Sequence, residues 1–310
     1  MDIARSILVV DSIGSMSTEG IEQFIRDGFA YVKLPQPELE DVLKELHKEA
    51  VLFFNQPMAE KEKNGIKFDP ETIQGYVDRR KEKDENPILH EQIFFRPNQP
   101  LGPFKALNTE IDSVQKTFWL DIGKPLIELV LHRVLSTAQF DSIKINELFR
   151  EATDDVFSSL SLLYYPFTKQ PELFECGLNE HTDQSFITVL WVTQESLQVW
   201  LEDDEASSAP SRKAGVWHDL YPKEGYVIVN IGNALKVILG DRCNSALHRV
   251  LIPKQERLSI AAFYDPISTY IMRDIVENKL VFGGSAVAYL KDHFSKTYSP
   301  TFEKTLENKS

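Results

Sequence analysis

The sequence predicts a mainly β fold in which helices surround a sandwich or closed barrel. From about Val156 onward, short apolar runs rich in β-branched and aromatic residues recur between turn signals, which is typical of such folds. Before that point, longer segments carry apolar residues at helical spacing. No linker rich in Gly, Ser or Pro separates the two parts, and no repeat is visible. We therefore expect one domain over residues 1–310.

Residues 1–150 or so are expected to form a helix-rich part that packs on the barrel. Ser17 or Thr18 can cap a helix that ends before Gly28, where a strand should follow. Pro125 is expected to kink or interrupt a second long helical pattern. The other elements predicted here are a strand in 6–13, an amphipathic helix in 36–57, strand pieces at 75–77 and 91–95, and the interrupted helix over 106–136.

The barrel core is expected over about 156–285, followed by a helix over about 286–300. Its strands are predicted in the segments SLSLLYYPF, SFITVLWV, LQVWLE, GVWHDL, GYVIVNIG, LHRVLI and RLSIAAFYDP. The insert EDDEASSAPSRKAG reads as an exposed loop between two of these strands. Gly225 and Gly232 are expected to mark strand ends and turns.

Charge and composition exclude several classes of partner. A net charge of −13 argues against nucleic acid and anionic membranes, both of which attract clustered Lys and Arg. A small acid remains possible, because one buried Arg can bind it despite an acidic surface. The two cysteines, Cys176 and Cys243, fit free thiols in a reducing compartment. With no signal peptide and no apolar run of about 20 residues, a cytoplasmic protein is expected, and no protein partner is implied.

Three separated residues have the chemistry of a metal site. His181 and Asp183 stand two residues apart beside an apolar strand, so their side chains can point the same way. Together with His248 they provide two imidazoles and one carboxylate, a set that leaves coordination positions open on mononuclear non-haem iron(II). Structural zinc usually takes four ligands that include thiolates, and neither cysteine has suitable spacing.

Arg257 and Ser259 follow His248 across what reads as a turn between antiparallel strands. A turn centred near Pro253 would place Arg257 roughly opposite His248, with Ser259 on the same face. A guanidinium can bind a carboxylate through two parallel hydrogen bonds. This pair beside a metal therefore suggests a dicarboxylate whose far end it anchors.

The order of these residues resembles that of the iron(II)- and 2-oxoglutarate-dependent oxygenases, in the isopenicillin N synthase-like branch. Further landmarks are similar in the same order, from about residue 20 to about residue 300: FIRDGFAYVKL, FFNQPMAEKEK, QGY, EQIFF and LLYYPF. The resemblance implies a double-stranded β-helix, or jelly-roll, core.

Carried onto this chain, the resemblance makes His181, Asp183 and His248 the iron ligands. Arg257 and Ser259 would bind the distal carboxylate of 2-oxoglutarate, and Tyr165 would assist. Relatives commonly have Asn two residues before that tyrosine, where this chain has Leu163. The lost hydrogen bond would weaken the cosubstrate or reshape its pocket.

The activity implied is oxidation of an unactivated C–H bond of a small specialised metabolite by dioxygen. Hydroxylation, desaturation and oxidative ring closure are all open. A halogenase is disfavoured, because Asp183 fills the position that a halide would need. One alternative is an iron oxidase that takes electrons from its substrate or from ascorbate instead of 2-oxoglutarate, with Arg257 and Ser259 binding the substrate. The other is a non-catalytic receptor for a small acid on the same scaffold.

Only a few basic residues in the sequence give information about the substrate. Arg79, Arg80 and Arg96 could meet a carboxylate, which favours an amino-acid-derived, carboxylate-bearing substrate, although a solvated charge run is the simpler account of the first two. His90 lies in a segment expected to border the pocket mouth and is a candidate substrate contact. His293 has no partner in the local sequence and receives no role.

Overall fold

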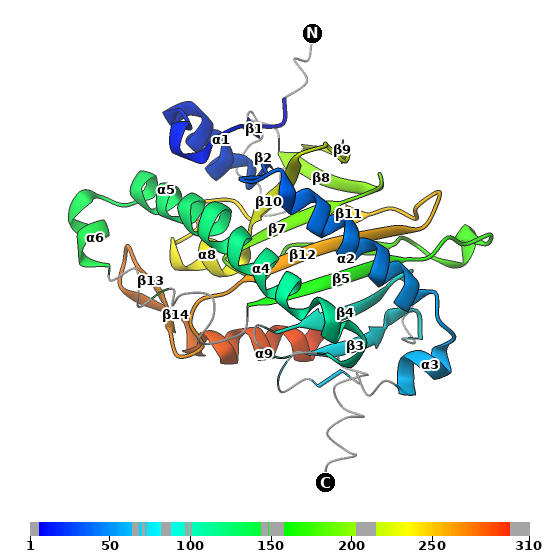
Figure 1. The fold of residues 1–310 in the computed structure, drawn as a ribbon. Coiled ribbons are helices and arrows are strands. Elements are labelled where there is room, and N and C mark those ends of the chain that lie inside the picture. The colour runs from blue at the N-terminus through cyan, green and yellow to red at the C-terminus, as the bar shows by residue number, and fades with distance from the viewer. Residues whose placement is uncertain are drawn as a thin grey trace.

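Two antiparallel β-sheets dominate the computed structural model, which describes residues 6–63, 68, 69, 72, 74–81, 88–96, 99, 101–143, 148, 158–202 and 215–297 (Figure 1). The large sheet has the order β1 (Val9–Val10), β2 (Phe29–Lys33), β10 (Tyr226–Ile231), β7 (Ile187–Val192), β12 (Arg257–Tyr264), β5 (Ser159–Tyr165), β4 (Glu91–Phe95) and β3 (Gly75–Asp78); only β1 and β2 pair in parallel among these described strands. The smaller sheet has the order β6 (Leu178–His181), β11 (His248–Val250), β8 (Leu197–Glu202) and β9 (Gly215–Leu220). This is the predicted double-stranded β-helix.

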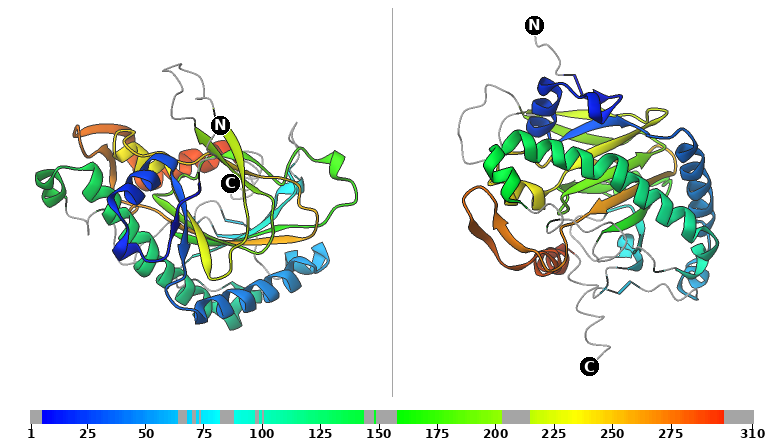
Figure 2. Two further views of the ribbon diagram at one scale, coloured as in Figure 1. Left: turned by 90° about the horizontal axis from the view of Figure 1, so that it is seen from above. Right: turned by 60° about the vertical axis from the view of Figure 1, so that its left-hand side comes forward.

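The principal helices cover one face of the large sheet (Figures 1 and 2). They are α2 (Glu38–Phe54), α4 (Asn108–Phe118), η4 (Trp119–Gly123) and α5 (Lys124–Val134). The remaining described elements are α1 (Thr18–Asp27), α3 (Met58–Lys63), α6 (Thr137–Ser142), α8 (Asn233–Ile238) and α9 (Ala286–Thr297), the short turns η1 (Ile13–Ser15), η2 (Arg79–Lys81), η3 (Gly102–Leu107) and η5 (Pro171–Leu173), and a hairpin of β13 (Ile271–Asp274) and β14 (Lys279–Ser285).

Local sequence signals explain the ends of the first helix. Ser17 is its N-cap, and the side chain of Ser17 accepts a hydrogen bond of 3.1 Å from the Gly20 amide. Gly28 ends the helix in the left-handed conformation, with φ of 77°. A Cβ at Gly28 would lie 2.5 Å from the carbonyl oxygen of Asn244, so glycine is required both for the turn and for this close approach.

The long helical pattern over 106–136 is interrupted as predicted, in the residues just before Pro125. The π-helical turn η4 separates α4 from α5, and the amide of Lys124 bonds to the carbonyl of Trp119, five residues back. Pro125 has no backbone N–H and cannot continue a regular α-helical ladder. The wider turn lets both halves stay on the sheet.

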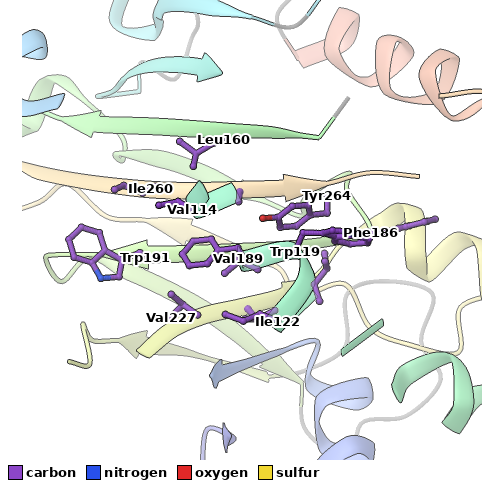
Figure 3. Close-up of a cluster of buried hydrophobic side chains, with 14 of the residues drawn as sticks. Val114, Trp119, Ile122, Leu160, Phe186, Val189, Trp191, Val227, Ile260 and Tyr264 are labelled. Carbon is purple, nitrogen blue, oxygen red and sulfur yellow. The ribbon is translucent and has the colours of Figure 1, made fainter. Parts of the chain in front are cut away.

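Strand alternation divides the protein interior into two layers. In β12, Ile260 and Ala262 join the cluster that packs under the helices, whereas Ala261 joins the cluster between the two sheets. Figure 3 shows the helix-side layer, where Val114 lies near Ile260 and Ile122 lies near Val227. Arg257 and Ser259 share the parity of Ala261, so they lie on the face that turns to the smaller sheet, as predicted.

The predicted pairing of the last two barrel strands is wrong. Arg257 stands opposite Tyr165 of β5, and His248 stands opposite His181 of β6 and Val199 of β8. The segment between β11 and β12 therefore crosses from one sheet to the other instead of closing a hairpin. Arg257 and His248 belong to facing sheets.

All seven predicted barrel strands are present, and the C-terminal helix is found as α9. The sequence analysis missed β6, α8, β13 and β14. The predicted loop in 202–215 falls almost entirely outside the described residues, and the division of the chain into domains stays a prediction. No helix among the described residues has the length and apolar character that crossing a membrane requires.

Candidate metal centre and active site

The structure brings His181, Asp183 and His248 together between the two sheets. One ligand atom from each lies within 4.8 Å of the others. The Oδ1 atom of Asp183 is 3.7 Å from Nε2 of His181 and 3.6 Å from Nε2 of His248. His181 ends β6, whereas Asp183 lies in the segment that leads to β7. The expectation that one strand carries both residues is therefore wrong.

Each histidine is oriented by a second hydrogen bond. Nδ1 of His181 lies 2.7 Å from the carbonyl oxygen of Asn179, and Nδ1 of His248 lies 2.9 Å from that of Ala246. A carbonyl only accepts, so each Nδ1 carries a proton, and each Nε2 faces the shared centre. Such bonds are the usual support of metal-binding imidazoles.

Asp183 is held in the same manner. Its Oδ2 atom accepts hydrogen bonds from the Thr188 hydroxyl at 2.5 Å and the Asn230 amide at 2.8 Å. These bonds leave Oδ1 directed at the two imidazoles. Thr188 and Asn230 were not found by the sequence analysis; the available signal was a polar residue within each of two apolar strands, β7 and β10.

The protonation of the centre suits a cation. Burial and the neighbouring His248 lower the pKa of His181 to about 4, which keeps this imidazole neutral at pH 7. Burial raises the pKa of Asp183, but the two histidines and the bonds from Asn230 and Thr188 outweigh it, so the net pKa is lowered. Two imidazoles and one carboxylate on one side fit iron(II), and the described residues supply no fourth ligand to this group.

A close backbone contact fixes the bend that carries Asp183. A Cβ at Gly232 would lie 2.0 Å from the carbonyl oxygen of Ser185, so only glycine fits here. The amide of Asn233 also bonds to the carbonyl of Asp183 at 2.7 Å. Gly232 thus marks a strand end, as predicted, and lets the start of α8 hold the metal-binding bend.

Arg257, Ser259 and Tyr165 lie on adjacent strands at the interior face. Arg257 is 1% exposed, and none of its three side-chain nitrogens has a hydrogen bond of normal geometry within the described part of the chain; its Cζ lies 4.9 Å from the centre of the Tyr165 ring. Burial lowers the pKa of Arg257, opposed by the nearby Tyr165 hydroxyl. A buried cation without an acceptor is costly, so its nitrogens point to an anionic ligand. The distal carboxylate of 2-oxoglutarate fits that requirement.

Leu163 stands where the family resemblance led us to expect Asn. It lies opposite Ser259 on β12 and opposite Gln92 on β4, and it lines a cavity beside His181 and Asp183. An apolar side chain there cannot donate or accept a hydrogen bond.

A cavity of about 350 Å³ opens beside the metal-binding group. His181 and Asp183 line it together with residues from β4, β5, β6, the end of β12 and α9. His90 lies in its wall, as predicted, and His293, which received no role, also lines it. This volume suits a small ligand.

The two neighbouring arginines at the end of β3 have different surroundings. Arg80 bonds to Asp78 at 2.8 Å and to Glu91 at 2.7 Å. Glu91 also pairs with Lys61 at 2.5 Å and accepts a hydrogen bond from Tyr76. Arg79 is 7% exposed and lines the cavity. The view of both as a solvated charge run is therefore wrong, and of the two only Arg79 contributes to the cavity wall.

Asp265, directly after β12, was not recognised in the sequence. It lines the cavity, and its Oδ1 atom is enclosed without a hydrogen-bond partner among the described residues. Burial raises the pKa of Asp265 to about 7, although the charge of the buried Arg96 acts in the opposite direction. Alternation along the strand could have revealed this residue. Asp265 continues the series of interior-facing residues Arg257, Ser259, Ala261 and Phe263.

Comparison with known proteins agrees with this geometry. The model of the 2OG-Fe(II) oxygenase superfamily matches residues 156–266. The chain is 28% identical to jasmonate-induced oxygenase 1 of Arabidopsis thaliana over 75% of this chain and 55% of that protein, and 28% identical to a probable 1-aminocyclopropane-1-carboxylate oxidase of Dianthus caryophyllus over 72% and 70%. The alignment thus spans little more than half of the first relative.

A solved structure shares the fold over nearly its whole length. A full-length Neurospora crassa protein in complex with alpha-KG superposes with a TM-score of 0.73 at 20% identity, covering 96% of this chain and 98% of that one. Fold, site and sequence matches agree on one class: residues 156–266 match the 2OG-Fe(II) oxygenase superfamily, and the fold is shared over nearly the whole chain. The cofactors of this class are iron(II) and 2-oxoglutarate, and the structure holds residues that fit both.

Proposed function

We propose that this protein catalyses the iron(II)- and 2-oxoglutarate-dependent oxidation of an unactivated C–H bond in a small, carboxylate-bearing, amino-acid-derived metabolite. His181, Asp183 and His248 would hold the iron, and Arg257, Ser259 and Tyr165 the distal carboxylate of 2-oxoglutarate. The observation that carries the proposal is the convergence of three oriented ligand atoms, within 4.8 Å, on the same interior layer as a fully buried guanidinium that lacks an acceptor among the described residues.

Iron held by His181, Asp183 and His248 would supply the activation of dioxygen. The protein supplies position. The carbonyls of Asn179 and Ala246 fix both imidazoles, and Thr188 and Asn230 fix the carboxylate. Arg257 on β12 would orient the cosubstrate through its distal carboxylate. The apolar side chains of Leu163 and Phe263, which line the cavity, would exclude water from it.

Arg79 supports the assignment of an anionic substrate. It is a buried guanidinium in the wall of a cavity that also contains His181 and Asp183. Hydroxylation, desaturation and ring closure remain alternatives at this site, because the position of the substrate decides among them. A cytoplasmic location and the absence of macromolecular partners stay predictions.

The cofactor assignment is tested by anaerobic reconstitution. Ferrous ion followed by 2-oxoglutarate should produce a weak visible charge-transfer band, and titration of the band gives the affinity. Arg257→Leu should weaken 2-oxoglutarate by at least about 100-fold, because a bidentate charge-assisted contact is lost. Arg273→Leu, in the hairpin of β13 and β14, is the matched control and should titrate like the wild type. Equal affinity in Arg257→Leu would refute the assignment.

A second candidate is an iron oxidase that does not consume 2-oxoglutarate, with Arg257 and Ser259 binding the substrate. Leu163 favours it, since it removes a polar side chain opposite Ser259. Omitting 2-oxoglutarate from a turnover assay that contains ascorbate separates the two: undiminished product supports the second candidate, and loss of product supports the first.

A further inference from the structure

Two buried polar atoms in the cavity wall have no hydrogen-bond partner in the part of the chain that the structure describes. They are Nδ1 of His90, a residue that is 1% exposed, and Oδ1 of Asp265. Buried polar atoms are almost always paired, so unpaired atoms that line a cavity indicate the groups a ligand brings. Arg257 has the same property on the cosubstrate side.

The two atoms belong to opposite ends of the cavity. His90 immediately precedes Glu91, which stands opposite Tyr164 of β5. Asp265 follows Phe263, which stands opposite Ser159 at the other end of β5. The interval from Ser159 to Tyr164 is roughly 16 Å along a strand. The carboxylate and amine of an α-amino acid are separated by one carbon atom. These two groups therefore cannot contact both ends of the cavity at once.

The two ends also present different polar groups. The backbone amide of Arg79 donates a hydrogen bond of 3.1 Å to the carbonyl of His90. Burial is the main cause of the lowered pKa of His90, and the charge of Arg79 lowers this pKa further. The first end therefore combines a guanidinium with a neutral imidazole and suits a carboxylate. The second end presents a carboxyl oxygen that can accept a hydrogen bond, with Arg96 as the nearby cation.

We propose that Asp265 binds a primary amine of the substrate, and that the substrate is an amino acid whose amine and carboxylate are separated by several carbons, with the carboxylate at Arg79 and His90. The middle of such a molecule would pass the metal-binding group, because His181 and Asp183 line the cavity along with both ends. This inference rests on the proposed function, since it identifies the substrate class of the same site.

Two isomers and one analogue test the spacing. The probes are 7-aminoheptanoate, its isomer 2-aminoheptanoate, in which the amine is next to the carboxylate, and heptanoate, which lacks the amine. Calorimetric titration into anaerobic protein loaded with ferrous ion and 2-oxoglutarate gives each affinity. A charge-assisted hydrogen bond predicts that 7-aminoheptanoate binds about tenfold tighter than either of the other two.

Variants assign the effect to its residues. In Asp265→Asn the preference for 7-aminoheptanoate over heptanoate should fall below about threefold. In Arg79→Gln both compounds should weaken while their ratio persists. Asp121→Asn, an exposed carboxylate in η4, should match the wild type. Circular dichroism checks the fold of each variant, and the comparison of isomers in the wild type holds even where a variant fails to fold.

Three outcomes would overturn the inference: equal binding of the two isomers, an unchanged preference in Asp265→Asn, or binding of none of the probes at millimolar concentration. A failure of the protein to bind 2-oxoglutarate contradicts the proposed function separately, and the preference among the probes is then measured with the ferrous protein alone.

Discussion

The two interior layers of this protein are built from the same strands and have opposite character. The layer under the helices is a continuous apolar cluster that includes Ile93, Val189 and Ile260. The layer between the sheets contains apolar residues as well, but also the three candidate metal ligands, Arg257 and the cavity. Alternate residues of one strand thus serve stability on one face and chemistry on the other, so their substitutions should have separable effects.

The largest effect is expected at the metal-binding group. Asp183→Ala should lower iron affinity and 2-oxoglutarate consumption by at least about 100-fold, more than the loss of a supporting residue typically does. Thr188 and Asn230 lose their acceptor, so stability should fall by about 1–3 kcal/mol as well. Iron content per chain after dialysis is the measurement. A full equivalent of iron retained by the variant would contradict the assignment.

A pair of substitutions in β12 tests the separation directly. Ile260→Ala should cost about 2–5 kcal/mol of unfolding free energy, because it opens a cavity in the helix-side layer, and should change 2-oxoglutarate affinity less than about threefold. Arg257→Leu should show the reverse: lost cosubstrate affinity with stability equal to or above that of the wild type, since a buried charge without an acceptor is removed. Urea unfolding measures both. Similar losses of stability in the two variants would disprove the separation.

Acid should reveal the buried imidazole in the cavity wall. Burial lowers the pKa of His90 to about 3, below that of an unfolded histidine at about 6.5. Between these values the unfolded chain binds more protons, so the contribution of His90 to stability falls as pH falls. The stability difference between wild type and His90→Gln, measured without metal, should shrink by up to about 1.4 kcal/mol per pH unit from pH 6.5 to 4.

His132→Gln, at an exposed position on α5, is the matched control for the histidine-to-glutamine change itself. A constant difference between wild type and His90→Gln across this range would show that His90 is not buried in a neutral form.

The smallest effect is expected from restoring the family residue at the interior face of β5. Leu163→Asn should tighten 2-oxoglutarate by about threefold to tenfold, which corresponds to one neutral hydrogen bond near the cosubstrate. Titration of the visible band measures the change. Leu160→Asn, on the helix-facing side of the same strand, should destabilise the protein with no gain in affinity. Weaker binding in Leu163→Asn would favour the candidate that does not use 2-oxoglutarate.

Sequence reasoning succeeded wherever a local period or an ordered motif carried the information. Ser17 and Gly28 marked the ends of α1, and Pro125 marked the interruption of the long helix. It failed to predict which strands pair. The connection after His248 was predicted to be a hairpin turn, but β11 and β12 lie in different sheets. The sequence of a short polar turn does not indicate which sheet the following strand joins.

The sequence by itself determined the class of fold, the three candidate metal ligands and the interior face of β12, because alternation along a strand and the order of a motif are properties of the chain. Only the tertiary structure decided which polar residues meet. It separated Arg79 from Arg80, added Thr188 and Asn230 to the support of Asp183, and brought Asp265 and His90 to opposite ends of one cavity. Such contacts depend on the register and crossing of distant strands, which burial of the whole core selects and no local pattern encodes.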